Sequence, residues 1–571
     1  MAGILLKVFT MRQESSDVIP RKRIWLKPLL ILAFIALALA GGWRFYENWK
    51  LRSLVEQARV LTDQGDYRQA MLALQRALQI RPASAAATRG MAELSDRLGF
   101  PLAVEWRRAA SELSPKSTTD SLALASSALR HRQTDLAERA LKDIEEEGRG
   151  SAQFHATAGN AAVAAGHYAK AEEHFAKALE IEPQNAGVEY NLAVTRVQSP
   201  DPKKRAAALE TLARLAEGGK MDVLARRTLI TRLQREKKWE EALRWSTRQI
   251  ESAAVEFRDR LAHLDLLRAT ESKELDAAVT TAETAFAKAA DVDVAALINW
   301  LRGAGRAEEA LRWSSTLAPD LVLAPIVATA RAECLITLTR WADLQTLVET
   351  SNWKDREYAR LAYRSRAARE RGDDLTASAS WEAALHVAKS RDQISQLAWM
   401  AHRWQRPEEL RKTLWEAARQ AKPEWALQML HGLYRQDGDM EGMLRVARAL
   451  LERDEKNAQA RNNVAMLSLL LQKDAPKALE TARILHEQAP TNATFASTYA
   501  FALHVGGRSA EGLAVLKRLS PEQLQDPGVA AYYALLLHAN GADSEAPPYL
   551  ELAKKATLLP AEKNLLAPMQ R

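Results

Sequence analysis

The sequence has little of what stabilises small or strand-rich domains. It holds one cysteine, Cys334, in 571 residues, so no intramolecular disulfide bond can form. Glycine and proline are not enriched, with 24 and 20 residues, and no Val/Ile/Thr-rich segments alternate between turn signals. These absences argue against a disulfide-stapled fold and against a β domain. Cys334 lies in the apolar segment RAECLITL and is expected to be a small core residue.

The sequence also lacks the motifs that carry common chemistry. It contains no GxxxxGK[ST], GxGxxG, HExxH or GxSxG pattern, and its 11 histidines are scattered. We therefore predict no catalytic residues, no cofactor, no metal site and no small-molecule substrate, and we expect the protein not to be an enzyme.

The formal net charge of +8 is unevenly distributed. Residues 1–52 hold nine Lys/Arg and three Asp/Glu, a net of +6, which leaves +2 for the remaining 519 residues. Phosphate binding needs a concentrated positive surface, so the near-neutral body predicts no nucleic-acid partner. A local basic run is interpreted as solvated helix faces, and it consists of Arg226, Arg227, Arg232, Arg235, Lys237 and Lys238.

Residues 152–185 form the clearest unit of the chain. Two amphipathic helices are expected over roughly 152–165 and 169–181, with Gly166-His167 between them and Pro183 stopping the second. Small residues are expected where the helices approach closely, and two aromatic residues are expected to fill the remaining space. These packing residues are Gly159, Ala171 and Ala178, together with Tyr168 and Phe175. With Pro183, they resemble the tetratricopeptide (TPR) repeat in spacing and type, although His155 replaces its usual early Trp.

A 34-residue period extends over most of the chain. EEALRWS occurs at 240–246 and again at 308–314, two periods apart, and the packing residues Ala70, Ala77, Pro82, Ala478 and Pro490 fall in register. The small or apolar residue that marks each second helix recurs at Ala70, Val104, Ala137, Ala171, Ala208, Ala242, Ala278, Ala310, Leu344, Ala377, Leu410, Met443, Ala478, Gly512 and Ala546.

This period predicts an all-α fold, a right-handed superhelical α-solenoid of about 15 TPR-like helix pairs preceded by one transmembrane helix. We assign 51–198 as well-matched repeats, 203–457 as degenerate Trp-rich repeats, 458–526 as repeats, and 527–571 as a final helix pair and cap. The segment QSPDP at 198–202 is a domain boundary or a longer turn. Most tryptophans of 203–457 are expected to be core residues.

The N-terminal segment resembles a membrane anchor. Arg21, Lys22, Arg23 and Lys27 precede a stretch from Leu29 to Trp43 without any charged residue, and Trp25 and Trp43 lie at its edges. We predict a cytoplasmic basic tail at 1–23, a transmembrane signal anchor at 24–46, and a periplasmic repeat domain at a bacterial inner membrane. A cleaved signal peptide ending near Ala40 is the alternative.

Resemblance to TPR proteins implies a concave groove that binds protein partners. Asn160 and Asn191 match a groove pair of peptide-binding members, although Ala156 replaces the lysine of a carboxylate clamp. We therefore expect a membrane-anchored scaffold whose protein partners are envelope assembly or export components. The alternatives are a periplasmic solenoid that binds carbohydrate, exopolysaccharide or cell wall through exposed tryptophans, and a regulatory TPR module that faces the cytoplasm.

Overall fold

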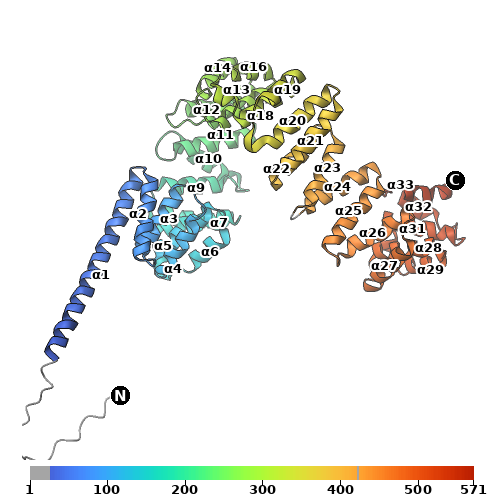
Figure 1. Cartoon of the computed structure of the whole chain (residues 1–571), viewed down its shortest axis with the longest axis horizontal. Helices are drawn as coiled ribbons and strands as arrows, with labels where there is room; N and C mark the ends of the chain where they lie inside the picture. Colours follow the sequence, from blue (N-terminus) through green and yellow to red (C-terminus); the bar gives the residue numbers. More distant parts are fainter. Residues whose placement is uncertain (1–25, 421–422, 571) are drawn as a thin grey trace, which may run out of the picture. The chain divides into compact units, whose positions relative to one another are not determined.

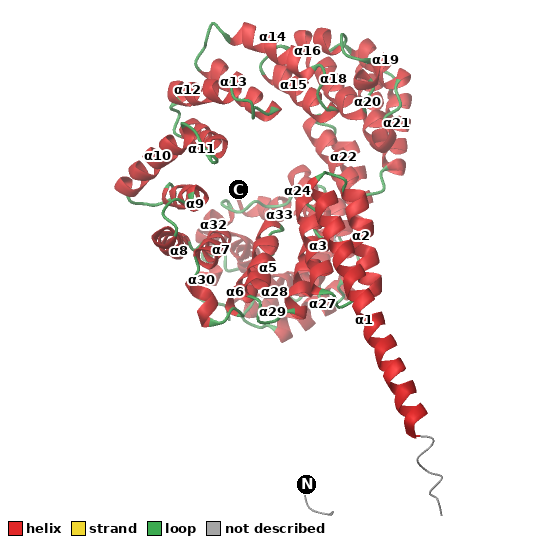
Figure 2. Cartoon of the chain, turned by 90° about the vertical axis from the view of Figure 1, so that its left-hand side faces the viewer, coloured by secondary structure: helices red, strands yellow, loops and turns green. Residues whose placement is uncertain are grey.

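The computed structural model describes the chain except residues 1–25, 421–422 and 571, and for residues 26–40 and 570 it describes the backbone only. Helices joined by short loops make up the described residues, which contain no strand (Figure 2). The chain divides into two compact units, unit 1 up to Val279 and unit 2 from Thr280. The sequence predicted no boundary at this point, and the segment boundaries that it did suggest stay predictions.

Most helices alternate as first and second members of consecutive pairs (Figure 1). The pairs that begin in unit 1 are α1 (Leu26–Asp63) and α2 (Tyr67–Ile80), α3 (Ala85–Arg97) and α4 (Ala103–Leu113), α5 (Thr118–Arg130) and α6 (Thr134–Lys142), α7 (Ala152–Ala164) and α8 (Tyr168–Ile181), α9 (Ala186–Arg196) and α10 (Pro202–Ala216), α11 (Asp222–Arg235) and α12 (Trp239–Ile250), and α13 (Phe257–Ala269) and α14 (Leu275–Phe286). The last of these helices, α14, spans the unit boundary.

Unit 2 continues the same order. Its pairs are α15 (Asp291–Gly303) and α16 (Ala307–Ser314), α18 (Pro325–Thr337) and α19 (Trp341–Thr350), α20 (Glu357–Glu370) and α21 (Asp374–Val387), α22 (Arg391–Arg403) and α23 (Pro407–Ala418), α24 (Glu424–Asp437) and α25 (Met440–Arg453), α26 (Ala458–Leu470) and α27 (Ala475–Gln488), α28 (Ala493–Val505) and α29 (Ser509–Leu516), and α31 (Pro527–Ala539) and α32 (Pro547–Ala553). The short helices α17 (Pro319–Val322), α30 (Pro521–Leu524) and α33 (Pro560–Leu566) stand outside this alternation. The order of the helices confirms the predicted all-α array of helix pairs, while the handedness of a superhelix stays a prediction.

Side-chain caps start many of the first helices. Ser84, Ser117, Ser151 and Asn185 each accept a hydrogen bond from the backbone N–H three residues later, at the start of α3, α5, α7 and α9. Such a cap satisfies one of the N–H groups that a helix start leaves unpaired, which fixes where each pair begins.

The turn inside each pair carries the period of the fold. A residue with left-handed backbone recurs every 33 to 35 residues, apart from one double step between Gly166 and Lys237. Glycine occupies this position at Gly65 (φ 82°) and Gly166 (φ 78°), where it adopts the conformation without steric cost. The double step contains the QSPDP segment, whose first four residues lie in the loop between α9 and α10 and whose last residue, Pro202, begins α10.

Small buried residues hold the helices of a pair together. The recurring residue predicted for the second helices is buried at each position except Ala278, where the adjacent Val279 is fully buried instead. Phe175 is also fully buried, whereas Tyr168 is 49% exposed, so Phe175 fills the space in this pair without the help expected from Tyr168. Pro82, Pro183 and Pro490 are exposed and follow the ends of α2, α8 and α27.

Cys334 is fully buried in α18, as the sequence predicts. Burial raises the pKa of its thiol to about 11, so roughly one thiol in a thousand is ionised at pH 8. We expect the native chain to react with a disulfide reagent such as DTNB at least a hundredfold more slowly than the urea-unfolded chain, because only the thiolate attacks. Equal rates at pH 8 would contradict a buried Cys334.

Candidate peptide-binding site

The structure brings Asn160 and Asn191 together on neighbouring first helices. Asn160 lies on α7 and Asn191 on α9, and the Asn191 Nδ2 donates a hydrogen bond to the Asn160 Oδ1 at 3.1 Å. No other hydrogen bond of either side chain occurs within the described residues. The N–H donors of the Asn160 amide and the carbonyl acceptor of the Asn191 amide therefore remain available. This is the complement of a peptide unit, which offers one carbonyl and one N–H.

A cleft of about 260 Å³ lies between α9, the helix that carries Asn191, and α11. Tyr190 and Val194 of α9 and Leu224 of α11 contribute apolar surface to its lining, and Leu224 is 45% exposed. The Tyr190 hydroxyl and the Thr228 Oγ1 are 2.8 Å apart, which joins the two helices. We refer to this feature as the α9–α11 cleft, and its lining residues are Tyr190, Val194, Val197, Gln198, Leu224, Arg227, Thr228, Thr231, Arg232 and Arg235.

The charged side chains that line the α9–α11 cleft are all arginines. Arg227 pairs with Asp259 and Glu256, at 2.7 and 2.8 Å, and the hydrogen bonds that its guanidinium donates to Asp259 raise its pKa. Arg232 pairs with Glu236. Arg235 is exposed and forms no ion pair with any described residue. The cleft therefore presents an apolar floor and a net positive wall.

The basic run of α11 differs from the solvated surface expected from the sequence. Arg226 is buried, because it donates to the backbone carbonyl of Ala216 and pairs with Asp222. Three other arginines line the α9–α11 cleft instead of an open surface. Helical spacing of Leu224, Thr228, Thr231 and Arg235 places them on one face, and this is the signal that could have revealed the cleft.

Tryptophans of the repeats are mainly packing residues. Four of them are buried, namely Trp313, Trp353, Trp381 and Trp404. Among the described tryptophans after residue 50, only Trp399 is largely exposed, at 56%. The guanidinium of Arg403 covers its ring at 4.5 Å. A series of exposed tryptophans, which carbohydrate stacking would need, is therefore missing from the described residues.

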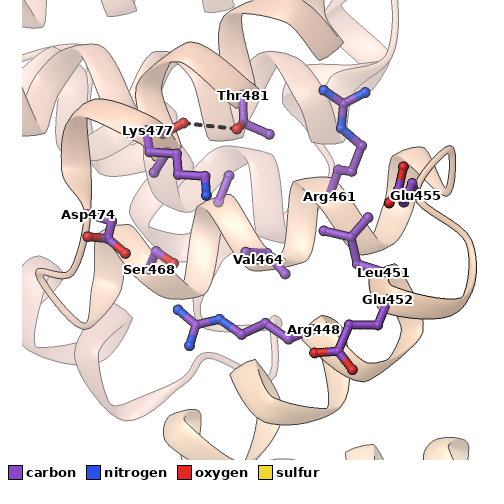
Figure 3. Close-up of a pocket in the computed structure, with 12 residues that line it drawn as sticks. Arg448, Leu451, Glu452, Glu455, Arg461, Val464, Ser468, Asp474, Lys477 and Thr481 are labelled. Atoms are coloured by element: carbon purple, nitrogen blue, oxygen red, sulfur yellow. Dashed lines mark hydrogen bonds between the residues drawn. The ribbon is translucent and has the colours of Figure 1, made fainter.

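A larger hollow of about 540 Å³ lies in unit 2, between α25, α26 and α27 (Figure 3). Leu451 and Val464 contribute apolar side chains to it. Its charged lining is balanced, three of each sign, namely Arg448, Arg461 and Lys477 with Glu452, Glu455 and Asp474. This balance selects no ligand charge, in contrast to the α9–α11 cleft.

The residues predicted for the membrane anchor lie mostly outside the part of the chain that the structure describes. Arg21, Lys22, Arg23 and Trp25 lie outside the described residues, and Lys27 falls where only the backbone of α1 is described. Trp43 is 65% exposed. Among the helices of the described residues, none combines the length and the apolar character that a membrane crossing requires. The span at 24–46 stays a prediction.

A histidine pair links α7, the helix that carries Asn160, to α8. The Nδ1 atoms of His155 in α7 and His174 in α8 are 3.1 Å apart, so one carries the proton and the other accepts it. Burial lowers the pKa of both imidazoles below the ordinary value of 6.5. The unfolded chain then binds more protons than the folded chain below about pH 6.5, so the stability of this pair falls as the pH falls through that range.

We expect hydrogen exchange of the α7 and α8 amides, corrected for the intrinsic pH dependence, to report faster opening at pH 5.5 than at pH 7.5. Replacement of His155 by leucine should flatten this pH dependence, whereas His402→Gln, at an exposed position in unit 2, should leave it unchanged. If the exchange rates of the His155 variant depended on pH as steeply as those of the wild-type chain, the histidine pair would not be the cause of the pH dependence.

Comparison with known proteins supports the repeat assignment. The tetratricopeptide repeat family matches residues 51–84 and 152–185, so the chain carries TPR repeats in its N-terminal third. No curated protein matches the chain.

Solved structures with a similar helical arrangement include pilF of Pseudomonas aeruginosa (14% identity, 43% of this chain and 95% of that chain, TM-score 0.26). They also include YrrB, described as a TPR protein with an unusual peptide-binding site (18%, 30% and 90%, 0.27). A third is the APC/C heterotetramer Cut9–Hcn1 (11%, 78% and 95%, 0.26). At these TM-scores, no functional conclusion follows from the similarity.

Proposed function

We propose that the chain is a protein-interaction scaffold that binds an extended peptide across α7, α9 and α11. The observation that carries this proposal is that α9 contributes both Asn191 of the asparagine pair and residues that line the α9–α11 cleft. Asn191, Val194 and Gln198 are spaced by three and four residues along α9 and so share one face of that helix. A peptide held at the asparagine pair would pass directly into the cleft.

The chemistry of this surface defines the peptide. The asparagine pair offers a donor and an acceptor to a backbone unit, which is independent of the peptide sequence. Tyr190, Val194 and Leu224 offer apolar contact to one side chain, and Arg235 offers an unpaired cation to the next. We infer that the preferred segment alternates acidic and apolar residues.

Fluorescence anisotropy with labelled 12-residue peptides tests this function. The set comprises a peptide of alternating Glu and Leu, the same peptide with Gln for Glu, and one with Lys for Glu. We expect binding to the purified chain in the order Glu, Gln, Lys. Added salt should weaken binding of the Glu peptide, strengthen binding of the Lys peptide and change that of the Gln peptide little. Equal binding of all three, or none, would overturn the proposal.

Attachment to a membrane is a separate part of the proposal. We propose that residues 24–46 anchor the scaffold in a bacterial inner membrane, with the repeats in the periplasm and envelope components as partners. The basic residues before an uncharged stretch support this assignment. Carbonate extraction of membranes should leave the full chain in the pellet and release a chain without residues 1–46. A C-terminal topology reporter separates the periplasmic from the cytoplasmic arrangement.

A further inference from the structure

A hollow of about 440 Å³ in unit 2 lies between α16, α18 and α19, of which α18 contacts both of the others. It is far along the chain from the α9–α11 cleft and is built from different helices. Its charged lining comprises the arginines Arg312, Arg331 and Arg340 and the carboxylates Glu308 and Asp343. The way in which these charges pair decides what the hollow can bind.

Arg340 engages both carboxylates of the hollow. Its Nη1 lies 3.3 Å from the Glu308 Oε2, and its Nε lies 2.6 Å from the Asp343 Oδ2. Neither carboxylate forms an ion pair with another arginine of the described chain. Arg312 and Arg331 are therefore left without a counter-charge in this hollow.

Arg331 is the unusual member, because it is partly buried as well as unpaired. Its Nε is buried without a hydrogen-bond partner in the described residues, and its Nη2 has only a long hydrogen bond of 3.4 Å to the Ser315 Oγ. Burial lowers the pKa of its guanidinium, and no carboxylate offsets this effect. The adjacent Glu333 is engaged elsewhere, by Tyr363 and Arg403.

A half-buried cation with a buried, unsatisfied N–H is costly, and a fold usually satisfies such a group with a carboxylate, water or a bound anion. The hydroxyls nearby cannot supply the missing charge. Ser315 and Thr346 donate to the backbone carbonyls of Leu311 and Ala342. A guanidinium can instead grip two oxygens of one carboxylate or phosphate at once.

We propose that Arg331 and Arg312 form an oxyanion-binding site of unit 2, which takes a carboxylate or a phosphate group. Arg331 supplies a half-buried guanidinium with a buried Nε, and the exposed Arg312 supplies a second cation. Leu323, which is 51% exposed, and Leu347 also line the hollow. These leucines can contact an apolar residue next to an acidic one in a peptide. The oxyanion bound here is therefore either the carboxylate of such a peptide or a free phosphate, and the experiment distinguishes the two.

Isothermal titration calorimetry of the full chain tests this site with two probes, inorganic phosphate and an acetylated, amidated Leu-Glu-Leu peptide. We expect saturable binding of at least one probe, at least tenfold weaker in Arg331→Ala and severalfold weaker in Arg312→Ala. Glu308→Gln should bind severalfold more tightly, because it removes negative charge from the hollow. Stronger binding of the peptide indicates a protein partner, and binding of phosphate alone indicates a small anion.

The matched control is Arg483→Ala, which removes one exposed arginine that pairs with Glu480 and Glu487 in the same unit. It changes the net charge equally and should leave binding unchanged. Saturable binding of neither probe, or an equal loss in the Arg483 variant, would overturn the proposal.

Thermal unfolding without ligand separates a binding role from a structural one. Arg331→Met keeps the length of the side chain and removes the unpaired charge, so we expect its unfolding midpoint to rise. Phosphate or the tripeptide should raise the midpoint of the wild-type chain and leave that of the variant unchanged. A lower midpoint for Arg331→Met would show that Arg331 stabilises the fold, and the proposal would be wrong.

Discussion

Replacement of Phe175 by alanine is expected to destabilise the α7–α8 pair by about 3–5 kcal/mol, because the ring is fully buried and its removal leaves a cavity. Local opening should then raise the hydrogen-exchange rates of the α7 and α8 amides roughly 100-fold to several-thousand-fold. Amide exchange is the appropriate measurement, because a repeat array does not unfold as a single two-state unit. Tyr168→Ala, in the same helix but 49% exposed, is the matched control and should cost roughly 1 kcal/mol or less.

A second substitution tests the cause of this effect. A Cβ added at Gly159 would lie 2.5 to 2.9 Å from atoms of the Phe175 ring. Gly159→Ala should therefore destabilise the wild-type chain. In the Phe175→Ala chain the ring is gone, and the same change should stabilise α7 by up to about 1 kcal/mol through helix propensity. Independent effects of the two substitutions would contradict direct packing of Phe175 on Gly159.

The helix pairs could be predicted because the buried positions of the repeat are small or apolar and recur at one spacing. Ala70, Ala171 and Ala478 are buried as this spacing requires. The register slipped by one residue at Ala278, where Val279 takes the buried position. Adjacent Ala and Val both satisfy an apolar pattern, so the sequence alone could not separate them.

The turn inside each pair was harder to read for a related reason. The left-handed turn residue is glycine in some well-matched and some degenerate repeats, such as Gly166 and Gly305, but Arg132, Lys237, Thr339 or Gln405 in others. Packing of the flanking helices holds these residues in a conformation that their own side chains disfavour. A signal that depends on neighbouring helices cannot be read from the local sequence.

Of the candidate sites, the sequence predicted one and missed two. Asn160 and Asn191 were found through resemblance to a repeat family, and the structure places them in contact. The α9–α11 cleft and the hollow around Arg331 were missed, because charge runs do not show which arginines already have a carboxylate. Arg227 is neutralised by Asp259, 32 residues further along, whereas Arg331 has no such partner. Pairing across helices decides which charges remain for a ligand.

Reversal of the charge at Arg235 is expected to cause the largest loss of peptide binding. Arg235 is exposed and unpaired in the described chain, so Arg235→Glu should fold normally while it turns an attractive contact with an acidic peptide into a repulsive one. We expect the Kd for the alternating Glu and Leu peptide to rise at least tenfold, and the Kd for its Lys counterpart to fall. Anisotropy titrations at low and physiological salt would measure both changes, and the difference should shrink as salt increases.

Two further variants distinguish the contribution of the α9–α11 cleft to peptide binding from that of the asparagine pair. Lys237→Glu, just beyond α11 and outside the lining of the cleft, makes the same change in charge and should alter the Kd less than threefold. The double substitution Asn160→Ala and Asn191→Ala should instead weaken all three peptides to a similar extent, because the pair contacts the peptide backbone. A uniform loss in the asparagine variant together with a charge-selective loss in the Arg235 variant assigns affinity to the first site and specificity to the second. If the Arg235 and Lys237 variants changed the Kd equally, the effect would come from the overall charge of the surface and not from binding in the cleft.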